Sequence, residues 1–222
     1  MSEKQKVIFD MDGTLYKFKG PENTTFVQSQ FYADLKVQIV DYIAARLNVS
    51  KQEAQQYMET VGQDYDGELS LGFEKEYAID RYDYYEGTWG AMTPAEYIVS
   101  NPDLKSMMDE FAGRSVLLTA APKVWAQKVI EYLNLGNVFE DRFITGEPDI
   151  RKPNPEVFKQ AAQLLGVDPE EVISVGDQNY SDIVPAASLG MKTILIGPEQ
   201  QSADYRVDSV IGALAILKAW QQ

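Results

Sequence analysis

The 222-residue chain contains no cysteine and no histidine. Their absence excludes disulfide bonds, thiolate nucleophiles, histidine-based catalytic triads and zinc sites of the Cys/His type. Any chemistry that the chain performs must therefore use Asp, Glu, Lys, Ser, Thr, Tyr or a bound cofactor.

Basic residues and long apolar runs are also scarce. Lys and Arg number 20 against 34 Asp and Glu, a formal net charge of -14. This balance argues against nucleic-acid polymers and anionic membranes as partners, because no basic run offsets the repulsion, although a metal ion and one lysine can still hold a small anionic substrate. No apolar run approaches the roughly 18 residues of a membrane span. The charged start "MSEKQKVIFD" has no signal-peptide core, so we expect a cytoplasmic protein.

Short apolar runs do alternate with helical patterns from Ser115 onward. The helical patterns span residues 124–133, 155–165 and 182–189. The strand candidates are "VIFD" (7–10), "SVLLTA" (115–120), "DRFITG" (141–146), "EVISVGD" (171–177) and "KTILIG" (192–197). Near-continuous apolar strands suit a parallel sheet that is buried on both faces. The alternation therefore predicts an α/β fold with a doubly wound, Rossmann-like parallel sheet.

Residues 18–96 break this rhythm and show no strand pattern. Leu35, Ile39, Ile43 and Leu47 form an i, i+4 stripe. Ser50 and Glu53 have the spacing of a helix N-cap with a capping box. We therefore predict a small helical domain over residues 18–96, inserted into an α/β core domain made of residues 1–17 and 97–222.

Polar side chains stand where the predicted strands end. Asp10 and Asp12 end the first strand, Thr119 follows "VLL", and Asp177 follows "VISVG". Lys152 precedes the predicted helix 155–165, whose start carries a capping Asn and a Pro in the first turn. Ligands of open α/β sheets bind beyond the carboxyl ends of the strands, so we expect these side chains to converge.

The converging residue types fit phosphoryl chemistry. Asp10 and Asp177 are hard oxygen ligands that suit Mg²⁺, which would also relieve the repulsion between neighbouring carboxylates. A carboxylate can attack phosphorus to form an aspartyl phosphate. Lys152 and Thr119 would then stabilise the phosphoryl oxygens. Asp12 can protonate the leaving alkoxide and later deprotonate the attacking water.

Four segments resemble, in order, the motifs of the haloacid dehalogenase superfamily in its phosphatase branch. They are "DMDGT", "VLLT", Lys152 in "RKPNPEVF", and "GDQNYSD". The resemblance implies Asp10 as nucleophile and Asp12 as acid/base. True dehalogenases of the superfamily lack the second carboxylate of the first motif, so Asp12 favours phosphate chemistry.

The same resemblance implies a set of metal and phosphate contacts. It places Mg²⁺ on Asp10, on the backbone carbonyl of Asp12 and on Asp177, with Asp182 orienting the water shell of the metal. Many relatives carry Asn after the motif-two hydroxyl, whereas this chain has Ala120. Only the backbone amide of Ala120 is therefore expected to contact phosphate, beside Thr119 and Lys152.

The inserted segment lies where this superfamily places a helical cap, which closes over the substrate. Tyr16 and the stretch "RYDYYEGTW" (81–89) resemble the pyrimidine 5'-nucleotidase-like subgroup, which makes Tyr16, Tyr85 and Trp89 candidate substrate contacts. Together with Phe18, Tyr82 and Tyr84, the cap aromatics have two interpretations. They offer a stacking face for a base, or they form the core of the cap.

We expect a Mg²⁺-dependent phosphatase that hydrolyses a small phosphomonoester through an aspartyl-phosphate intermediate. A nucleoside monophosphate is the first substrate candidate, and a phosphosugar or a phosphoglycolate-like acid is the second. One alternative is a phosphomutase of the same superfamily. The other is a non-catalytic member that binds a phosphorylated ligand or a protein.

Overall fold

Six parallel strands form the centre of the computed structural model, which describes residues 5–22, 24–147, 149–198 and 203–220. The strand order in the sheet is β5-β4-β1-β6-β7-β8. The strands are β1 (Lys6–Phe9), β4 (Ser115–Leu118), β5 (Phe143–Ile144), β6 (Val172–Gly176), β7 (Lys192–Ile196) and β8 (Tyr205–Val207). The first strand lies in the middle, between β4 and β6. The predicted doubly wound α/β fold is therefore confirmed, and β8 is an edge strand that the apolar runs did not predict.

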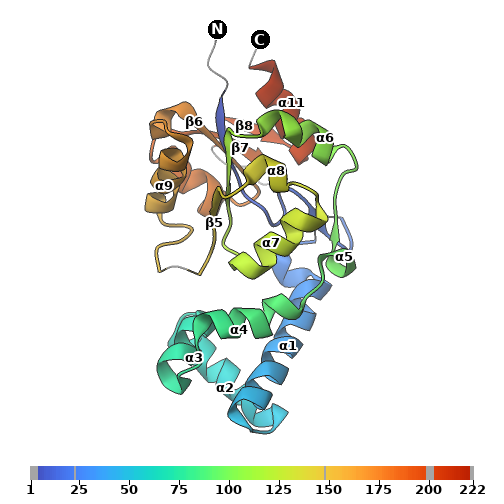
Figure 1. Ribbon diagram of the computed structural model, residues 1–222, viewed down its shortest axis with the longest axis vertical. Coiled ribbons are helices and arrows are strands. Elements are labelled where there is room, and N and C mark those ends of the chain that lie inside the picture. Colours follow the sequence, from blue (N-terminus) through green and yellow to red (C-terminus); the bar gives the residue numbers. More distant parts are fainter. Residues whose placement is uncertain (1–4, 23, 148, 199–202, 221–222) are drawn as a thin grey trace.

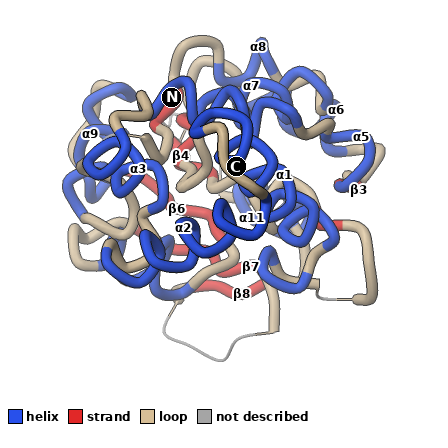
Figure 2. The backbone as a smooth tube through the Cα atoms, turned by 90° about the horizontal axis from the view of Figure 1, so that it is seen from below, coloured by secondary structure: helices blue, strands red, loops and turns tan. Residues whose placement is uncertain are grey.

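Helices cover both faces of this sheet (Figure 1). They are α6 (Leu104–Met108), α7 (Lys123–Tyr132), α8 (Gly136–Phe139), α9 (Pro155–Leu165), α10 (Val184–Ala187) and α11 (Val210–Ala219). Figure 2 shows the strands in the interior with helices around them. The predicted helix at 155–165 is confirmed with its Asn154 cap, whose side chain accepts a hydrogen bond from the Glu156 amide. The helix α11 was not predicted.

Alternate residues of the strands supply two separate cores. Val7 and Phe9 of β1 join the larger core, which includes Trp125 of α7 and residues of α8 and α11. Ile8 of β1 joins the smaller core with Phe158 and other residues of α9. Both faces of β1 are therefore buried against apolar side chains, which explains the unbroken apolar pattern of its sequence.

Four helices between the first and second strands of the sheet form what we call the cap. They are α1 (Gln30–Leu47), α2 (Lys51–Asp64), α3 (Leu69–Tyr77) and α4 (Arg81–Gly87). In Figure 1 they gather at the opposite end of the molecule from the two termini. The short helix α5 (Pro94–Tyr97) and a two-stranded antiparallel ribbon of β2 (Lys17–Phe18) and β3 (Ile98–Val99) connect the cap to the core. The exact domain limits at 18 and 96 stay a prediction.

The sequence patterns of the cap match its helices. Leu35, Ile39 and Ile43 are buried along α1. Ser50 caps α2, and its side chain and that of Glu53 exchange the hydrogen bonds of a capping box. The predicted i, i+4 stripe and the predicted capping box are both confirmed, because local spacing alone determines them.

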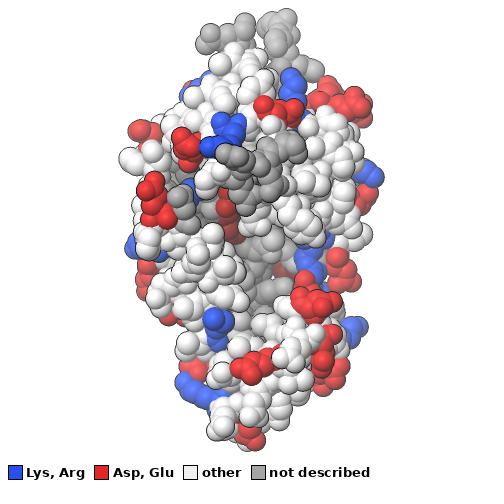
Figure 3. All heavy atoms as spheres, turned by 180° about the vertical axis from the view of Figure 1, so that it is seen from behind, with Lys and Arg blue, Asp and Glu red and all other residues white. Residues whose placement is uncertain are grey.

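Charged side chains are scattered over the face of the molecule that Figure 3 shows. Acidic side chains appear on the core and on the cap in the face that Figure 3 shows, with basic ones between them. None of the helices in the described part of the chain combines the length and apolar character that a bilayer crossing requires.

An aromatic cluster seats the cap on the core. Its members, which we call the junction cluster, are Tyr16, Phe18, Phe31, Trp89 and Trp125. Phe31 of α1 packs against Trp125 of α7 in the core, with ring centroids 4.5 Å apart. Both rings are fully buried, so this contact fixes where the first cap helix meets the sheet domain.

Truncation of Phe31 should therefore destabilise the whole protein. We expect Phe31→Ala to lower the free energy of unfolding by about 3–5 kcal/mol, because it removes a buried ring and leaves a cavity. Val27→Ala is the matched control, since Val27 is 65% exposed, and it should change stability by less than about 0.5 kcal/mol. Urea unfolding of the three proteins measures this. Equal stability of Phe31→Ala and wild type would contradict the role of the junction cluster.

Candidate active site

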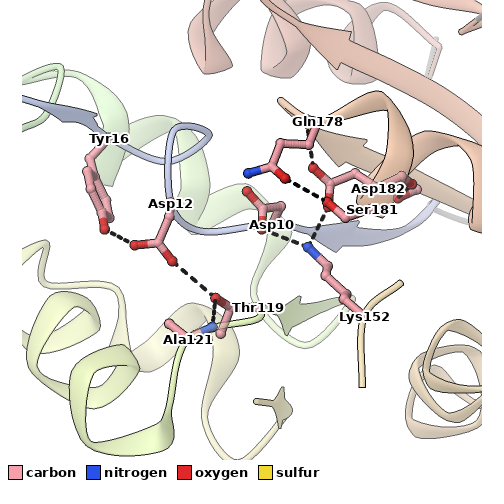
Figure 4. Close-up of polar contacts among 10 residues, drawn as sticks. Asp10, Asp12, Tyr16, Thr119, Ala121, Lys152, Gln178, Ser181 and Asp182 are labelled. Carbon is pink, nitrogen blue, oxygen red and sulfur yellow. Dashed lines mark hydrogen bonds and ion pairs between the residues drawn. The ribbon is translucent and has the colours of Figure 1, made fainter. Parts of the chain in front are cut away.

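The candidate site lies at the carboxyl ends of the three central strands (Figure 4). Asp10 follows β1, and its amide donates to the Val175 carbonyl of β6 at 2.9 Å. Thr119 follows β4, and its amide donates to the Ile144 carbonyl at 2.9 Å. Asp177 follows the glycine that ends β6. Backbone hydrogen bonds of the sheet therefore hold the first residues beyond the strands.

A buried lysine bridges two carboxylates at this edge. Lys152 Nζ donates to Asp10 Oδ1 at 2.7 Å and to Asp182 Oδ1 at 2.5 Å. All three side chains are at least nine-tenths buried. Burial by itself would lower the pKa of Lys152, but the Asp10 and Asp182 carboxylates outweigh it and raise that pKa. The lysine is therefore a permanent ammonium group with a third N–H left for another acceptor.

Asp182 is held in place from several sides. It lies in a π-helical turn over Asn179–Ile183, ahead of α10, where the sequence predicted the start of a regular helix. Its Oδ2 accepts from the Gln178 amide at 2.9 Å, and its carbonyl accepts from Ser174 Oγ at 3.1 Å. A Cβ on Gly176 would collide with the Asp182 side chain. Only glycine therefore fits at the end of β6.

The carboxylates of Asp10, Asp177 and Asp182 form one cluster. One oxygen of each lies within 4.8 Å of the others. Burial and the neighbouring carboxylates raise the pKa of Asp10 to about 7 and that of Asp177 to about 8. Gly13, at φ +81°, packs against the Asp177 carboxylate so closely that a Cβ would clash with it. The fold therefore holds three carboxylates close together, and the close packing of Gly13 keeps Asp177 among them.

This cluster fits a divalent cation. Asp10 Oδ2 and Asp177 Oδ1 are buried and have no hydrogen-bond partner among the described residues. Unpaired buried carboxylate oxygens are costly, and a hard cation satisfies them. The predicted ligands Asp10 and Asp177 are thus brought together, and Asp182, predicted to orient the water shell, lies in the cluster itself. The Asp12 carboxylate is not part of this cluster. The predicted ligation by the Asp12 backbone carbonyl stays a prediction.

The Asp12 side chain is surrounded by donors instead. Tyr16 donates its hydroxyl proton to Asp12 Oδ1, and Trp125 Nε1 donates to the same oxygen at 3.3 Å. Thr119 Oγ1 donates to Asp12 Oδ2 at 3.2 Å and accepts from the Ala121 amide at 3.0 Å. Burial raises the pKa of Asp12, and these hydrogen bonds oppose the rise. Trp125 had no predicted role, because the sequence only placed it within the helical pattern 124–133.

The candidate substrate contacts occupy different environments. Tyr16 is buried with its hydroxyl on Asp12. Tyr85 Oη lies 2.8 Å from Ser70 Oγ inside the cap. Trp89 stacks on Phe26, with ring centroids 5.9 Å apart and planes 6° apart. Substrate contact by Tyr16, Tyr85 and Trp89 stays a prediction.

The other members of the predicted stacking face differ in burial. Phe18 and Tyr84 are buried in the larger core, as the second interpretation of the cap aromatics expected. Tyr82 is 68% exposed.

The predicted phosphate-contacting loop carries an exposed Ala120. Gly146, after β5, lies against the Ala120 carbonyl so closely that a Cβ there would collide with it. Its amide donates to the Ala121 carbonyl at 2.9 Å. These contacts hold the loop in place, and the predicted phosphate contact of the Ala120 amide stays a prediction.

The loop before Lys152 also contacts the cap. Arg81 of α4 pairs with Asp149 at 3.0 Å and donates to the Glu147 carbonyl at 2.6 Å. In a second ion pair the basic residue belongs to the core: Arg151 of the loop pairs with Glu68 of the cap. A cavity of about 490 Å³ is lined by Glu68 and by the segment that contains Lys152. The cavity therefore lies between Glu68 of the cap and the core segment that contains Lys152.

Comparisons with known proteins agree with this architecture. The family model described as haloacid dehalogenase-like hydrolase matches residues 6–190. The chain therefore belongs to the haloacid dehalogenase-like hydrolase family, as the four motifs predicted.

Curated relatives of this chain are named as phosphatases. Glyceraldehyde 3-phosphate phosphatase of Pyrococcus furiosus is 43% identical over 72 residues, which cover 32% of this chain and only 29% of that protein. The protein of that name from Methanothermobacter thermautotrophicus is 28% identical over 89% of this chain and 88% of its own length. N-acylneuraminate-9-phosphatase of Mus musculus is 28% identical over 57% of this chain and 55% of its own.

A solved structure shares the whole fold. The haloacid dehalogenase (HAD) phosphatase from Thermococcus onnurineus superposes with a TM-score of 0.63 at 24% identity, over 96% of this chain and 97% of its own. This likeness supports the arrangement of core and cap.

The raised carboxyl pKa values predict how stability depends on pH without metal. Asp10 and Asp177 have an ordinary pKa of 3.8, raised in the folded chain to about 7 and about 8. The folded state thus binds more protons across this window, so the free energy of unfolding must fall as pH rises from about 4 to about 8. Thermal unfolding in EDTA should show this fall, and excess Mg²⁺ should remove most of it near pH 8.

The variant Asp177→Asn isolates the effect. It should flatten the fall in EDTA and abolish the stabilisation by Mg²⁺. Asp83→Asn is the control, because the Asp83 side chain is 66% exposed, and it should behave as wild type. A wild-type melting temperature that is independent of both pH and Mg²⁺ would contradict the cation site.

Proposed function

We propose that this protein is a Mg²⁺-dependent phosphatase that hydrolyses a small phosphomonoester through an aspartyl phosphate on Asp10. The observation that carries the proposal is the environment of Asp10. One oxygen accepts a hydrogen bond from the Lys152 ammonium at 2.7 Å, and the other is buried with no hydrogen-bond partner in the part of the chain that the structure describes. Lys152 therefore fixes the orientation of this carboxylate, and the second oxygen is left to bind the cation.

The proposed first step transfers the phosphoryl group to Asp10. An Asp10 oxygen attacks phosphorus, and the bond from phosphorus to the leaving oxygen breaks. Asp12, two residues further on, gives its proton to that oxygen and releases an alcohol. The remaining N–H of Lys152 and the Thr119 hydroxyl donate to the phosphoryl oxygens and stabilise their charge.

In the proposed second step, water attacks phosphorus and frees Asp10. Asp12 takes the proton of the water, and the bond from phosphorus to Asp10 breaks, which returns both residues to their starting state. Asp10 and Asp177 would hold the Mg²⁺, with Asp182 beside them. The bound cation would supply positive charge that neutralises these carboxylates and the phosphoryl oxygens.

We propose a phosphorylated sugar or a small phospho-acid as the substrate class. The relatives reported above are named glyceraldehyde 3-phosphate phosphatase and N-acylneuraminate-9-phosphatase. Phe18 and Tyr84 are packed in the core, which leaves fewer rings to stack on a base. A nucleoside monophosphate is the second candidate.

Phosphate release with and without Mg²⁺ tests this proposal. The panel consists of phosphosugars, small phospho-acids and nucleotides. We expect release that requires Mg²⁺, prefers a phosphosugar or a phospho-acid, and falls by at least about 1,000-fold in Asp10→Asn, because the nucleophile is lost. Preference for pyrimidine monophosphates would keep the mechanism and replace the substrate class.

Two other outcomes would overturn the hydrolase proposal. An isomeric phosphate ester formed without free phosphate would indicate a phosphomutase. Wild type and Asp10→Asn that are equally silent while both bind phosphorylated ligands would indicate a non-catalytic binding protein.

A further inference from the structure

The two oxygens of the Asp12 carboxylate have different partners. Oδ1 accepts hydrogen bonds from the Tyr16 hydroxyl and from Trp125 Nε1. Among the described residues, Oδ2 accepts only from Thr119 Oγ1, at 3.2 Å. Figure 4 shows Asp12 between Tyr16 on one side and Thr119 on the other. The carboxylate is therefore asymmetric: one oxygen has two donors and the other has one.

The donors on Oδ1 are rigid. The Tyr16 ring is 2% exposed and the Trp125 ring is fully buried. Trp125 Nε1 also lies 3.4 Å from the Tyr16 hydroxyl, so the two donors meet at the same oxygen. The ring of Phe18 packs on that of Tyr16, with ring centroids 5.4 Å apart. The ring of Phe31 packs on the indole of Trp125, with centroids 4.5 Å apart. Neither donor can follow the carboxylate if it turns.

The donor on Oδ2 is a rotatable hydroxyl. Thr119 Oγ1 is itself fixed by the Ala121 amide at 3.0 Å, but its proton turns about the C–O bond. When a phosphoryl group occupies the site of the proposed function, this hydroxyl can donate to the group instead. Oδ2 is then released while Oδ1 stays bound.

We propose that Tyr16 and Trp125 are positioning residues that anchor Asp12 through Oδ1, so that Oδ2 is the oxygen that carries the proton. This inference rests on the proposed phosphatase function. As the bond from phosphorus to the leaving oxygen breaks, the proton on Oδ2 passes to that oxygen. The attacking water later returns a proton to Oδ2. Tyr16 and Trp125 stay in place and exchange no proton with the substrate.

A comparison of leaving groups separates this role from a general structural one. A p-nitrophenolate leaves without protonation, whereas the alkoxide of a sugar or hydroxy acid needs a proton. Loss of the anchor should therefore slow the alkyl ester much more than the aryl ester. A merely loosened fold would slow both esters by the same factor.

The test measures kcat and KM of wild type and Tyr16→Phe. The substrates are p-nitrophenyl phosphate and the best alkyl phosphate of the panel. We expect kcat/KM, which reports only the steps up to loss of the leaving group, to fall roughly 10-fold or more for the alkyl ester and less than about threefold for the aryl ester. Trp125→Phe should shift the ratio in the same direction, and Asp12→Asn should shift it further. Equal losses on both esters, or no loss, would overturn the inference.

The matched control is Tyr97→Phe. The Tyr97 hydroxyl donates to the Asp34 carboxylate at 3.1 Å, and its ring packs on Phe31. Tyr97→Phe thus also removes a tyrosine hydroxyl that donates to a carboxylate beside the junction cluster, but this carboxylate is Asp34 and not Asp12. Its ratio of alkyl to aryl activity should equal that of wild type. A shift as large as that of Tyr16→Phe would overturn the inference.

A crystal structure of Tyr16→Phe tests the anchor without turnover. We expect the Asp12 carboxylate to rotate or to lose order, while the neighbouring Asp10 and Lys152 keep their positions. An Asp12 side chain that is unchanged from wild type would overturn the inference. Wild-type protein that releases no phosphate from either ester would refute the proposed function, and the crystal structures would still decide whether the anchor exists.

Discussion

The site depends on the pairing of the Lys152 ammonium with Asp10 and Asp182. Taking a charge out of water costs several kcal/mol, and a buried carboxylate stays ionised only beside a compensating charge. Lys152 provides that charge at 2.7 and 2.5 Å in a chain of formal net charge -14. It cannot neutralise the third carboxylate, Asp177, whose pKa rises to about 8. Three carboxylates against one ammonium leave two negative charges at this edge of the sheet, and this excess is the physical reason for proposing a divalent cation there.

A second constraint joins the cap to the chemistry. The junction cluster packs Phe31 of the first cap helix on Trp125, and the indole of Trp125 reaches Asp12. On the other side, Arg81 of the cap pairs with Asp149, shortly before Lys152. The cap therefore contacts two parts of the site. It reaches Asp12 through the packing of Phe31 on Trp125, and it reaches the loop before Lys152 through Arg81. Movement of the cap would reach the site by packing on one side and by ion pairs on the other.

Sequence patterns predict the parts of this protein that depend on local spacing. The buried strands β1, β4, β6 and β7 follow from apolar runs, and the convergence of Asp10, Thr119 and Asp177 follows from their position after those strands. The edge strand β8 has no such run, because its residues are largely exposed. The placement of Asp182 against Lys152 needs a π-helical turn, and the contact of Trp125 with Asp12 joins residues 113 positions apart. The motif "GDQNYSD" indicates that Asp182 belongs to the site. The contacts of Asp182 with Lys152 and of Trp125 with Asp12 have no local signature, since tertiary packing creates them.

The most direct test of the account is to identify the residue that carries the phosphoryl group. Wild-type protein with Mg²⁺ and its best substrate is quenched in acid within one turnover, digested, and analysed by peptide mass spectrometry. The account predicts a phosphorylated peptide that contains Asp10. When p-nitrophenyl phosphate is the substrate, whose leaving group needs no proton, Asp12→Asn should accumulate more of this peptide because breakdown by water is slowed. Rapid phosphate release with no phosphorylated peptide at any quench time, or with phosphate on another residue, would contradict it.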